Sequence, residues 1–470
     1  MNQATELSKA HYKNIPRILG LGLFLQQLDG MVLNTAIPEM ANSLGTEALS
    51  LKLAITSYLL TLAMFIPISG YIAERYGTQK VFLWAMIVFV IGSIFCGCSW
   101  DITTLIIGRL IQGAGAAMVT PVGRLILLKV FSKEDFLIAF TSYSLIGQIG
   151  FVVGPVLGGF MTSYINWRGI FFINLPIVLL GLFLVKKWIP NYESRDTLPA
   201  FDWIGFWVFG GLAGCFTFGF SWVTEENFSG IDPYLLLLLG VLLIFIYFFH
   251  QRNTVVPVLK LSLFKIRTFQ VSLVGGSWFR VFASGLTFLI PIQLQLDLGY
   301  SPFLSGVLIF FNALGFFITR HFFKEIMSFL GFKRALISSA FITGLTLFLF
   351  IFIDRTSPLW LIIGLLILMG LSSSIQYGAL NTLGFADVEK EDAAQASSVT
   401  AVFQQLGLTF SVCLCAGLLS LMGRFKGVST LSDIAFHWTY FFMGLMTLGS
   451  ILFYVHLTQK DGQHLIKNKK

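Results

Sequence analysis

The sequence predicts an all-helical protein that crosses a membrane many times. Of its 470 residues, 56% are apolar and only 11% are charged. Apolar runs of about 20 residues, the length that a helix needs to span a bilayer, recur along the whole chain. Because no stretch long enough for a separate domain lacks such a run, no soluble domain is expected.

Fourteen spans are predicted, each bounded by charged residues, turn formers, Gly or Pro. They cover residues 16–40, 50–72, 81–99, 102–130, 136–163, 169–187, 201–221, 233–250, 268–293, 302–322, 332–353, 358–382, 395–422 and 437–457. Most Lys and Arg residues then fall on the side that holds the N-terminus. Positive loops favour the cytoplasm, so both termini are expected there. The net charge of +8 is attributed to these loops, and no nucleic-acid partner is expected.

Two halves of the chain share a pattern at an offset of about 257 residues, as expected of parallel repeats in transporters. The aligned residues include Lys133-Glu134-Asp135 with Lys390-Glu391-Asp392, Ala139 with Ala396, Gln148 with Gln405, and Gly150 with Gly407. The repeat predicts a six-helix bundle in residues 1–187 and another in residues 268–470. Residues 188–267 would supply two extra spans and linkers.

Charged side chains at membrane depth are few, and such groups are costly unless they are paired or functional. Asp29 lies about 20 Å into the first span, and Arg109 lies about 10 Å into the fourth, which enters from the opposite side. In a hydrocarbon core of about 30 Å these depths nearly coincide. We therefore expect an Asp29–Arg109 pair whose breaking changes the proton affinity of the carboxylate. A purely structural buried pair is the alternative.

Arg280 is a third deep charge and has no acidic neighbour in its own helix. It is expected either to pair across helices or to receive an anionic substrate. Uncharged polar residues in the spans mark further candidates for a substrate cavity. With Arg280, the cavity candidates are Gln26, Asn34, Gln112, Gln293, Asn312, Gln376 and Tyr377.

The sequence lacks the motifs of ATP-driven transporters, of common hydrolases and of zinc sites. No G-x-x-x-x-G-K-[ST] loop is present for ATP, so the proton gradient is the expected energy source and no cofactor is expected. Neither G-x-S-x-G nor H-E-x-x-H occurs, so no catalytic residue is assigned, and an integral-membrane enzyme is the weaker class. The five cysteines lie in apolar spans without zinc-site spacing, so no metal site is expected.

One apolar run is unusually rich in helix-breaking residues. It contains Gly147, Gly150, Gly154, Pro155, Gly158 and Gly159. Small residues about one turn apart allow two membrane helices to approach closely, which predicts a packed and bending joint. The repeat aligns Gly154 and Pro155 with Ser411 and Val412, so this joint belongs to the first half only.

Five motifs in order resemble the major facilitator superfamily and, within it, the fourteen-helix drug:proton antiporter branch. They are Leu28–Pro38, Gly70–Lys80, Arg109–Ala117, Gly147–Gly159 and Trp167–Pro176. Glu74 stands where the family usually has Asp, and the family's basic residue at Thr78 or Gln79 is absent. Met31 replaces a common Thr.

The resemblance implies a fold of two six-helix bundles with two inserted central helices. It implies a monomeric exporter of small molecules in the inner membrane of a bacterium, driven by protons and working by a rocker switch in the lipid bilayer. It assigns proton coupling to Arg109 and the antiporter motif to residues 147–159. It also assigns a conformational latch to Gly70, Glu74, Arg75, Gly77 and Lys80.

The substrate stays open at this point. One deep Asp against two deep Arg residues leaves an anionic metabolite, such as a carboxylate or siderophore, as an alternative to a cationic drug. Import of such a metabolite is a second alternative. A membrane sensor that binds without transporting is a third, because a fold does not fix a function.

Overall fold

The computed structural model describes residues 9–190, 200–223, 232–389, 392–426, 429 and 431–466. Within these residues the chain is helical and contains no strand. Thirteen helices of the described part are long and apolar enough to cross a membrane. The first predicted span begins in a fourteenth helix, α1, which is long enough but carries Gln26, Gln27 and Asp29. The predicted all-helical membrane fold is confirmed, whereas the orientation of the termini stays a prediction.

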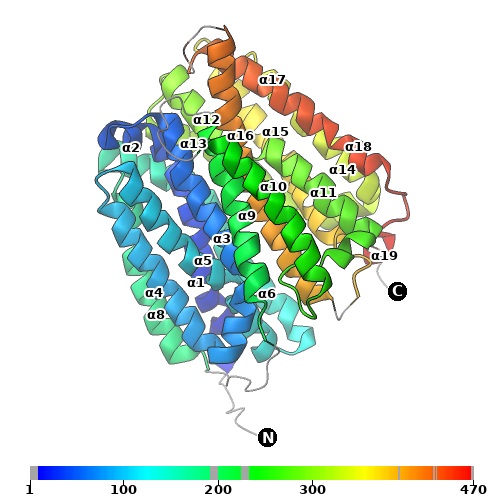
Figure 1. Ribbon diagram of the computed structural model, residues 1–470. Coiled ribbons are helices and arrows are strands. Elements are labelled where there is room, and N and C mark those ends of the chain that lie inside the picture. The colour runs from blue at the N-terminus through cyan, green and yellow to red at the C-terminus, as the bar shows by residue number, and fades with distance from the viewer. Residues whose placement is uncertain are drawn as a thin grey trace, which may run out of the picture.

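The first half is built from helices that run up and down past one another (Figure 1). They are α1 (Lys9–Val32), the short 3-10 helix η1 (Leu33–Ala36), α2 (Ile37–Leu44), the 3-10 helix η2 (Ala48–Leu51), α3 (Lys52–Tyr76), α4 (Thr78–Gly97), α5 (Ile102–Val130), α6 (Lys133–Tyr164), α7 (Gly169–Phe172) and α8 (Asn174–Trp188). Helix α1 packs along α6 and α8, and α5 packs between α3 and α4. The predicted span 16–40 is interrupted by η1.

Two helices, α9 (Trp203–Trp222) and α10 (Pro233–Arg252), lie between the halves in sequence and in front of their junction in Figure 1. Helix α9 contacts α3 of the first half and α16 of the second, while α10 packs on α9. The carboxylate of Asp202 accepts a hydrogen bond from the amide of Gly205 at 2.8 Å and contacts His250 Nε2 at 2.6 Å. The start of α9 is thereby tied to the end of α10.

The second half is also a bundle, and several of its helices are broken. Its elements are η3 (Leu261–Lys265), α11 (Arg267–Ala283), α12 (Leu286–Ile292), the π-helix η4 (Gln293–Asp297), α13 (Pro302–His321), α14 (Phe323–Phe350), α15 (Leu359–Leu383), α16 (Ala393–Lys426), α17 (Asp433–Gly449), α18 (Ile451–Val455) and α19 (Gln463–Ile466). The predicted span 268–293 breaks after Ala283. Gly331 has a φ of 70° and interrupts α14, so the spanning part of this helix follows it.

The two halves meet along two pairs of helices, α3 with α16 and α6 with α13. The second contact brings backbones together, because a Cβ atom on Gly306 would lie 2.2 Å from the carbonyl oxygen of Pro155. One end of this junction is filled by an apolar cluster from both halves, including Leu33 and Ile37 with Leu289 and Ile292. That end is closed. The exact boundaries of the predicted units, 1–187, 188–267 and 268–470, stay predictions.

Candidate functional site

Asp29 of α1 and Arg109 of α5 form a buried ion pair. The distance from Arg109 Nη1 to Asp29 Oδ2 is 2.6 Å, and each residue is 1% exposed. The structure thus brings together the two charges whose depths in the membrane coincide. Charges this deeply buried need partners on every side, since one unpaired ion in an apolar interior costs several kcal/mol.

Three further side chains from three helices complete the surroundings of the carboxylate. Gln112, one turn after Arg109, donates from Nε2 to Asp29 Oδ1 at 2.7 Å and accepts from Arg109 Nη1 at 2.7 Å. The hydroxyl of Ser93 in α4 accepts from Gln112 at 2.8 Å. Asn174 at the start of α8 donates to Ser93 at 3.2 Å and to Asp29 Oδ1 at 3.5 Å. We call these five residues the Asp29 network.

The guanidinium of Arg109 also reaches α3. Its Nε donates to the carbonyl oxygen of Ala54 at 3.2 Å, and its Cζ lies 4.1 Å from the centre of the Tyr58 ring. Both Arg109 and Tyr58 line a cavity of about 110 Å³ between the two halves, whereas Asp29 does not. The carboxylate therefore lies behind the arginine as seen from the cavity.

This central cavity is mostly apolar and is lined from both halves. The first half contributes the predicted residues Gln26 and Asn34, and Gln26 accepts a hydrogen bond from the Thr120 hydroxyl at 2.5 Å. The second half contributes Thr287 and Gln405. A smaller cavity of about 30 Å³ is lined by Met31, Asn34, Thr287 and Asn312, among others. The two cavities are neighbours at the junction, because Met31, Asn34 and Thr287 line both.

The other cavity candidates lie elsewhere. Gln112 belongs to the Asp29 network. Gln293 accepts from the Tyr440 hydroxyl at 2.6 Å, and Gln376 donates to Tyr454 at 2.7 Å, so both amides are held in helix contacts of the second half and line neither cavity. Arg280 and Tyr377 lie together, with Arg280 Cζ 5.0 Å from the ring centre.

The glycines of α6 lie against α1, the helix that carries Asp29. A Cβ atom added to Gly150 would lie 2.5 Å from the carbonyl oxygen of Phe24, and one on Gly158 would lie 2.2 Å from that of Val32. Gly147 and Gly154 similarly face Leu23 and Met31. Gly159 faces the other half, because a Cβ atom added to it would lie 2.3 Å from the carbonyl oxygen of Pro302 in α13. The segment therefore packs on two helices, one in each half, and α6 stays helical through Pro155.

The contacts of the loop assigned as a latch involve its uncharged residues and Arg75. Arg75 Nη1 donates to the Tyr71 hydroxyl at 2.9 Å, and in the described part of the chain no ion pair is formed by Glu74 or Lys80. Gln79 instead donates to the carbonyl oxygen of Ile189 at 2.6 Å, which ties the loop to the end of α8. Gly70 is uncrowded, and Gly77 has a φ of 94°, a backbone conformation that favours glycine.

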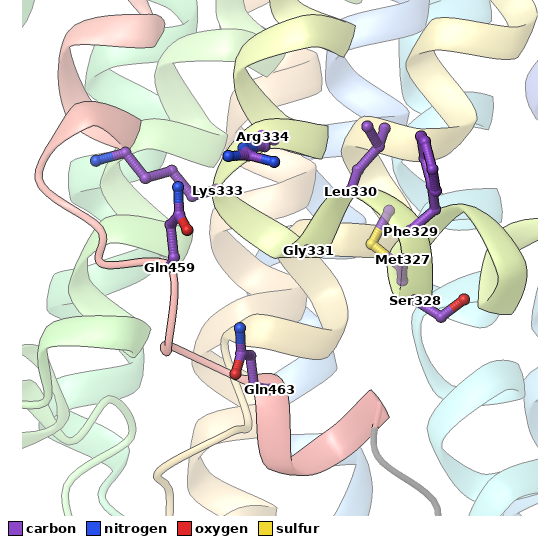
Figure 2. A pocket seen from close by; sticks show the side chains of 9 residues that line it. All are labelled: Met327, Ser328, Phe329, Leu330, Gly331, Lys333, Arg334, Gln459 and Gln463. Atoms are coloured by element: carbon purple, nitrogen blue, oxygen red, sulfur yellow. The ribbon is translucent and has the colours of Figure 1, made fainter.

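A different cavity, of about 300 Å³, lies near the break in α14 (Figure 2). It is lined by Met327, Ser328, Phe329, Leu330, Gly331, Lys333, Arg334, Gln459 and Gln463. None of these residues belongs to the Asp29 network or to the central cavity. Its side chains come from one helix and from the segment after α18, so it is not a second entrance to the site.

Sequence reasoning missed Ser93 and Asn174, which belong to the network, and Tyr58, whose ring lies against Arg109. Asn174 stands in the Trp167–Pro176 motif, which was the available signal, although no role was assigned to it. Ser93 and Tyr58 are single polar residues within apolar spans. Only the packing of α3 and α4 against α5 brings them to Arg109 and Gln112.

Comparisons with known proteins agree on the kind of protein. A family model described as "Major Facilitator Superfamily" matches residues 19–412 and 280–470. The chain is 32% identical to "Probable transport protein HsrA" of Haemophilus influenzae, over 97% of this chain and 98% of that protein. It is also 32% identical to "Putative multidrug resistance protein MdtD" of Cronobacter sakazakii, over 91% of each chain.

Solved structures share the fold at low sequence identity. A peptide transporter of the POT family in complex with sulfate has a TM-score of 0.71 and 14% identity, over 96% of this chain and 95% of that one. The nucleoside transporter NupG has a TM-score of 0.65 and 12% identity, over 94% and 99%. At these identities the similarity concerns the fold alone.

Proposed function

Because the chain belongs to the major facilitator superfamily, we propose that it exports small molecules across the cytoplasmic membrane of a bacterium in exchange for protons. Members of this family are transporters rather than enzymes. The relatives named for multidrug resistance support an export direction. The proposal adds to the family assignment a driving ion, a direction and the residues that couple them.

The observation that carries the proposal is the Asp29–Arg109 pair with its position behind the central cavity. The carboxylate of Asp29 and the guanidinium of Arg109 compensate each other's charge at 2.6 Å. If the guanidinium moves away, the buried carboxylate is left without a counter-ion, and binding a proton would remove the uncompensated charge. Proton binding at Asp29 is thereby linked to the place of Arg109.

The same arginine connects the carboxylate to the substrate space. Arg109 and Tyr58 both line the cavity, so a ligand there can change the contacts of the guanidinium without touching Asp29. A proton that enters from outside and binds Asp29 would release Arg109 and favour the state that lets the substrate go. A ligand that binds from the cytoplasmic side would favour the reverse step, in which Arg109 pairs with Asp29 again and the proton is released. This is alternating access between two bundles, with Asp29 as the switch.

The α6 glycines supply the mechanical connection. Helix α6 contacts α1 beside Asp29 and contacts α13 of the other half through Pro155 and Gly159. A change in how α1 sits on α6 can therefore be passed to the junction between the halves. We propose that this close packing also keeps the junction free of a proton leak.

The test uses inverted membrane vesicles with an imposed proton gradient, monitored with a pH-sensitive dye. An exchanged compound dissipates the gradient in vesicles with the natural protein. The Asp29→Asn variant keeps the side-chain shape and the hydrogen bond acceptor but cannot exchange a proton, so compound-induced dissipation should be lost.

Asp101→Asn is the matched control, because it removes one carboxylate that lies outside the network and leaves the helix cap in place. It should behave like the natural protein. Gradient-driven exchange that persists at the natural rate in Asp29→Asn would remove Asp29 from the mechanism. A protein that binds compounds yet never dissipates the gradient would instead be a sensor.

A further inference from the structure

Arg280 is a buried charge without a counter-ion. It lies in α11, is 6% exposed, and among the described residues no carboxylate contacts it and no acceptor receives a hydrogen bond from its guanidinium. The Cζ atom of its guanidinium lies 5.0 Å from the centre of the Tyr377 ring. A guanidinium carries five N–H donors, so this side chain has unused hydrogen-bonding capacity in an apolar bundle.

The surroundings leave room for the guanidinium. A Cβ atom on Gly276 would lie 3.1 Å from Arg280 Nη1, and one on Gly407 would lie 3.2 Å from Arg280 Cβ. Two glycines on two helices thus leave space for the arginine. Burying an unpaired charge costs more than any nearby packing returns, so a role in stability alone does not explain Arg280.

Arg280 itself lines neither cavity, but it shares a polar face of α11 and α12 with Thr287, which lines both. Ser277, Arg280, Ser284 and Thr287 follow one another at helical spacing. Thr287 is exposed and lines the cavity, and the Ser284 hydroxyl lies 2.6 Å from the Tyr377 hydroxyl. The hydroxyl of Ser277 is buried without a hydrogen-bond partner in the described residues. It is a second unused donor, one turn from the arginine.

We propose that Arg280 binds the carboxylate of an amphipathic organic anion whose apolar body occupies the central cavity. The guanidinium supplies a forked pair of donors that suits a carboxylate, and Ser277 supplies another hydroxyl. The walls of this cavity are mostly apolar, with Leu59, Leu62 and Leu408 among the lining residues. This inference rests on the proposed function and names the class of substrate that it moves.

The experiment measures binding of radiolabelled benzoate to the purified full-length protein in detergent by scintillation proximity. Unlabelled benzamide and benzylammonium are the competitors, because they keep the ring and replace the anion by a neutral or a cationic group. Labelled benzoate should bind saturably. Unlabelled benzoate should displace it at a concentration at least about tenfold lower than either analogue requires, as expected for a charge-assisted contact.

Arg280→Gln should bring benzoate down to the level of benzamide, and Arg280→Lys should retain part of the preference. Arg334→Gln is the matched control, since it removes an exposed arginine of the same half that lines only the cavity of Figure 2. If Arg280→Gln does not fold, the Arg280→Lys variant and the analogue series in the natural protein still decide.

Equal competition by benzoate, benzamide and benzylammonium would overturn the inference, and so would unchanged benzoate binding in Arg280→Gln. Absence of saturable benzoate binding to the natural protein would also overturn it. A different result would show that the proposed proton exchange is wrong while the anion site is real. In that case benzoate binding depends on Arg280, but no compound dissipates a proton gradient. Conversely, Asp29→Asn should lose exchange and keep benzoate binding.

Discussion

Each half of the molecule holds a deeply buried arginine beside a tyrosine ring, but among the described residues only the arginine of the first half is paired with a carboxylate. Arg109 lies 4.1 Å from the Tyr58 ring centre and is bound by Asp29, Gln112 and the carbonyl oxygen of Ala54. Arg280 lies 5.0 Å from the Tyr377 ring centre and has no hydrogen-bond acceptor among the described residues. The similar setting makes the missing carboxylate informative.

The difference separates two tasks. A paired charge can change its proton affinity when the pair opens, so it suits coupling to protons. An unpaired charge can bind an opposite charge from outside, so it suits a substrate. The repeat does not generate this arrangement, because the aligned position of Asp29 in the second half is Leu286 and that of Arg109 is Leu366. The two arginines arose at unrelated positions of the two halves.

The largest expected effect comes from removing Arg109. Arg109→Ala leaves Asp29 buried with no cation, and breaking a buried pair in this way costs about 3–5 kcal/mol. The free energy of unfolding in detergent should fall accordingly, measured by a thiol-reactive dye that reports exposure of the buried Cys96, Cys413 and Cys415. The double variant Asp29→Asn with Arg109→Gln removes both charges and should regain most of the loss. Equal stability of the single and double variants would contradict this.

The next effect compares two glycines that the repeat aligns, Gly150 and Gly407. A Cβ atom on Gly150 would lie 2.5 Å from the backbone oxygen of Phe24, which cannot move alone. The nearest atoms to one on Gly407 would be Arg280 Cβ at 3.2 Å and Cδ at 3.6 Å, with the backbone oxygen of Ser277 at an ordinary 4.0 Å. Gly150→Ala should cost about 2–3 kcal/mol through overpacking and should weaken exchange. Gly407→Ala should cost well under half as much. The dye assay above measures both, and similar losses would show that the aligned glycines are equivalent.

The pairing of Asp29 with Arg109 could be predicted from the sequence, because it depends on the depth of each residue in the membrane. A helix rises by a fixed amount per residue, so the positions of Asp29 and Arg109 within their spans placed the two charges at one level. The span boundaries came from apolar runs and mostly agree with the structure, as for 302–322 and Pro302–His321. The break in the helix after Ala283 could not be predicted from the sequence, because apolar residues typical of a spanning helix continue on both sides of it.

What the sequence could not supply is the side of each helix that faces a partner. Ser93 and Asn174 are short polar residues in apolar spans, and nothing in their spacing distinguishes a network member from a residue bonded to its own helix. Gln376 and Gln293 show the reverse case, since both were expected in the cavity and are held by Tyr454 and Tyr440. Polarity predicts that a residue avoids lipid, and packing decides whether it lines a cavity.

A smaller effect, of opposite sign, is expected at Arg280. Arg280→Met keeps a long side chain and removes the unpaired charge, so the free energy of unfolding should rise by about 1–2 kcal/mol as the desolvation cost disappears. The same substitution at Arg109 should destabilise the protein. Thermal unfolding of the two variants, measured without ligand, gives the contrast directly. Loss of stability in Arg280→Met would mean that the guanidinium has a structural partner.

The smallest expected effect on stability comes from the first residues of the two arginine-bearing helices, α5 and α11. Helix α5, which carries Arg109, starts with a capping box in which the Asp101 carboxylate accepts from the Thr104 amide at 2.7 Å, while α11, which carries Arg280, starts without a side-chain cap. The hydrogen bonds from Thr104 lower the pKa of Asp101. The stability from this cap is therefore complete above the ordinary carboxyl pKa of about 3.9 and is lost as the pH falls through the lowered value.

Asp101→Ala should lower the unfolding temperature slightly at pH 7, and the gap to the natural protein should narrow as the pH is brought toward 3. Asp101→Asn retains an uncharged cap and should show a smaller loss with little dependence on pH in this range. A gap between Asp101→Ala and the natural protein that stays constant down to pH 3 would mean that the ionised carboxylate contributes nothing to the start of α5. In that case the place of Arg109 would be fixed by the Asp29 network alone, and the two arginine helices would differ only in their buried contacts.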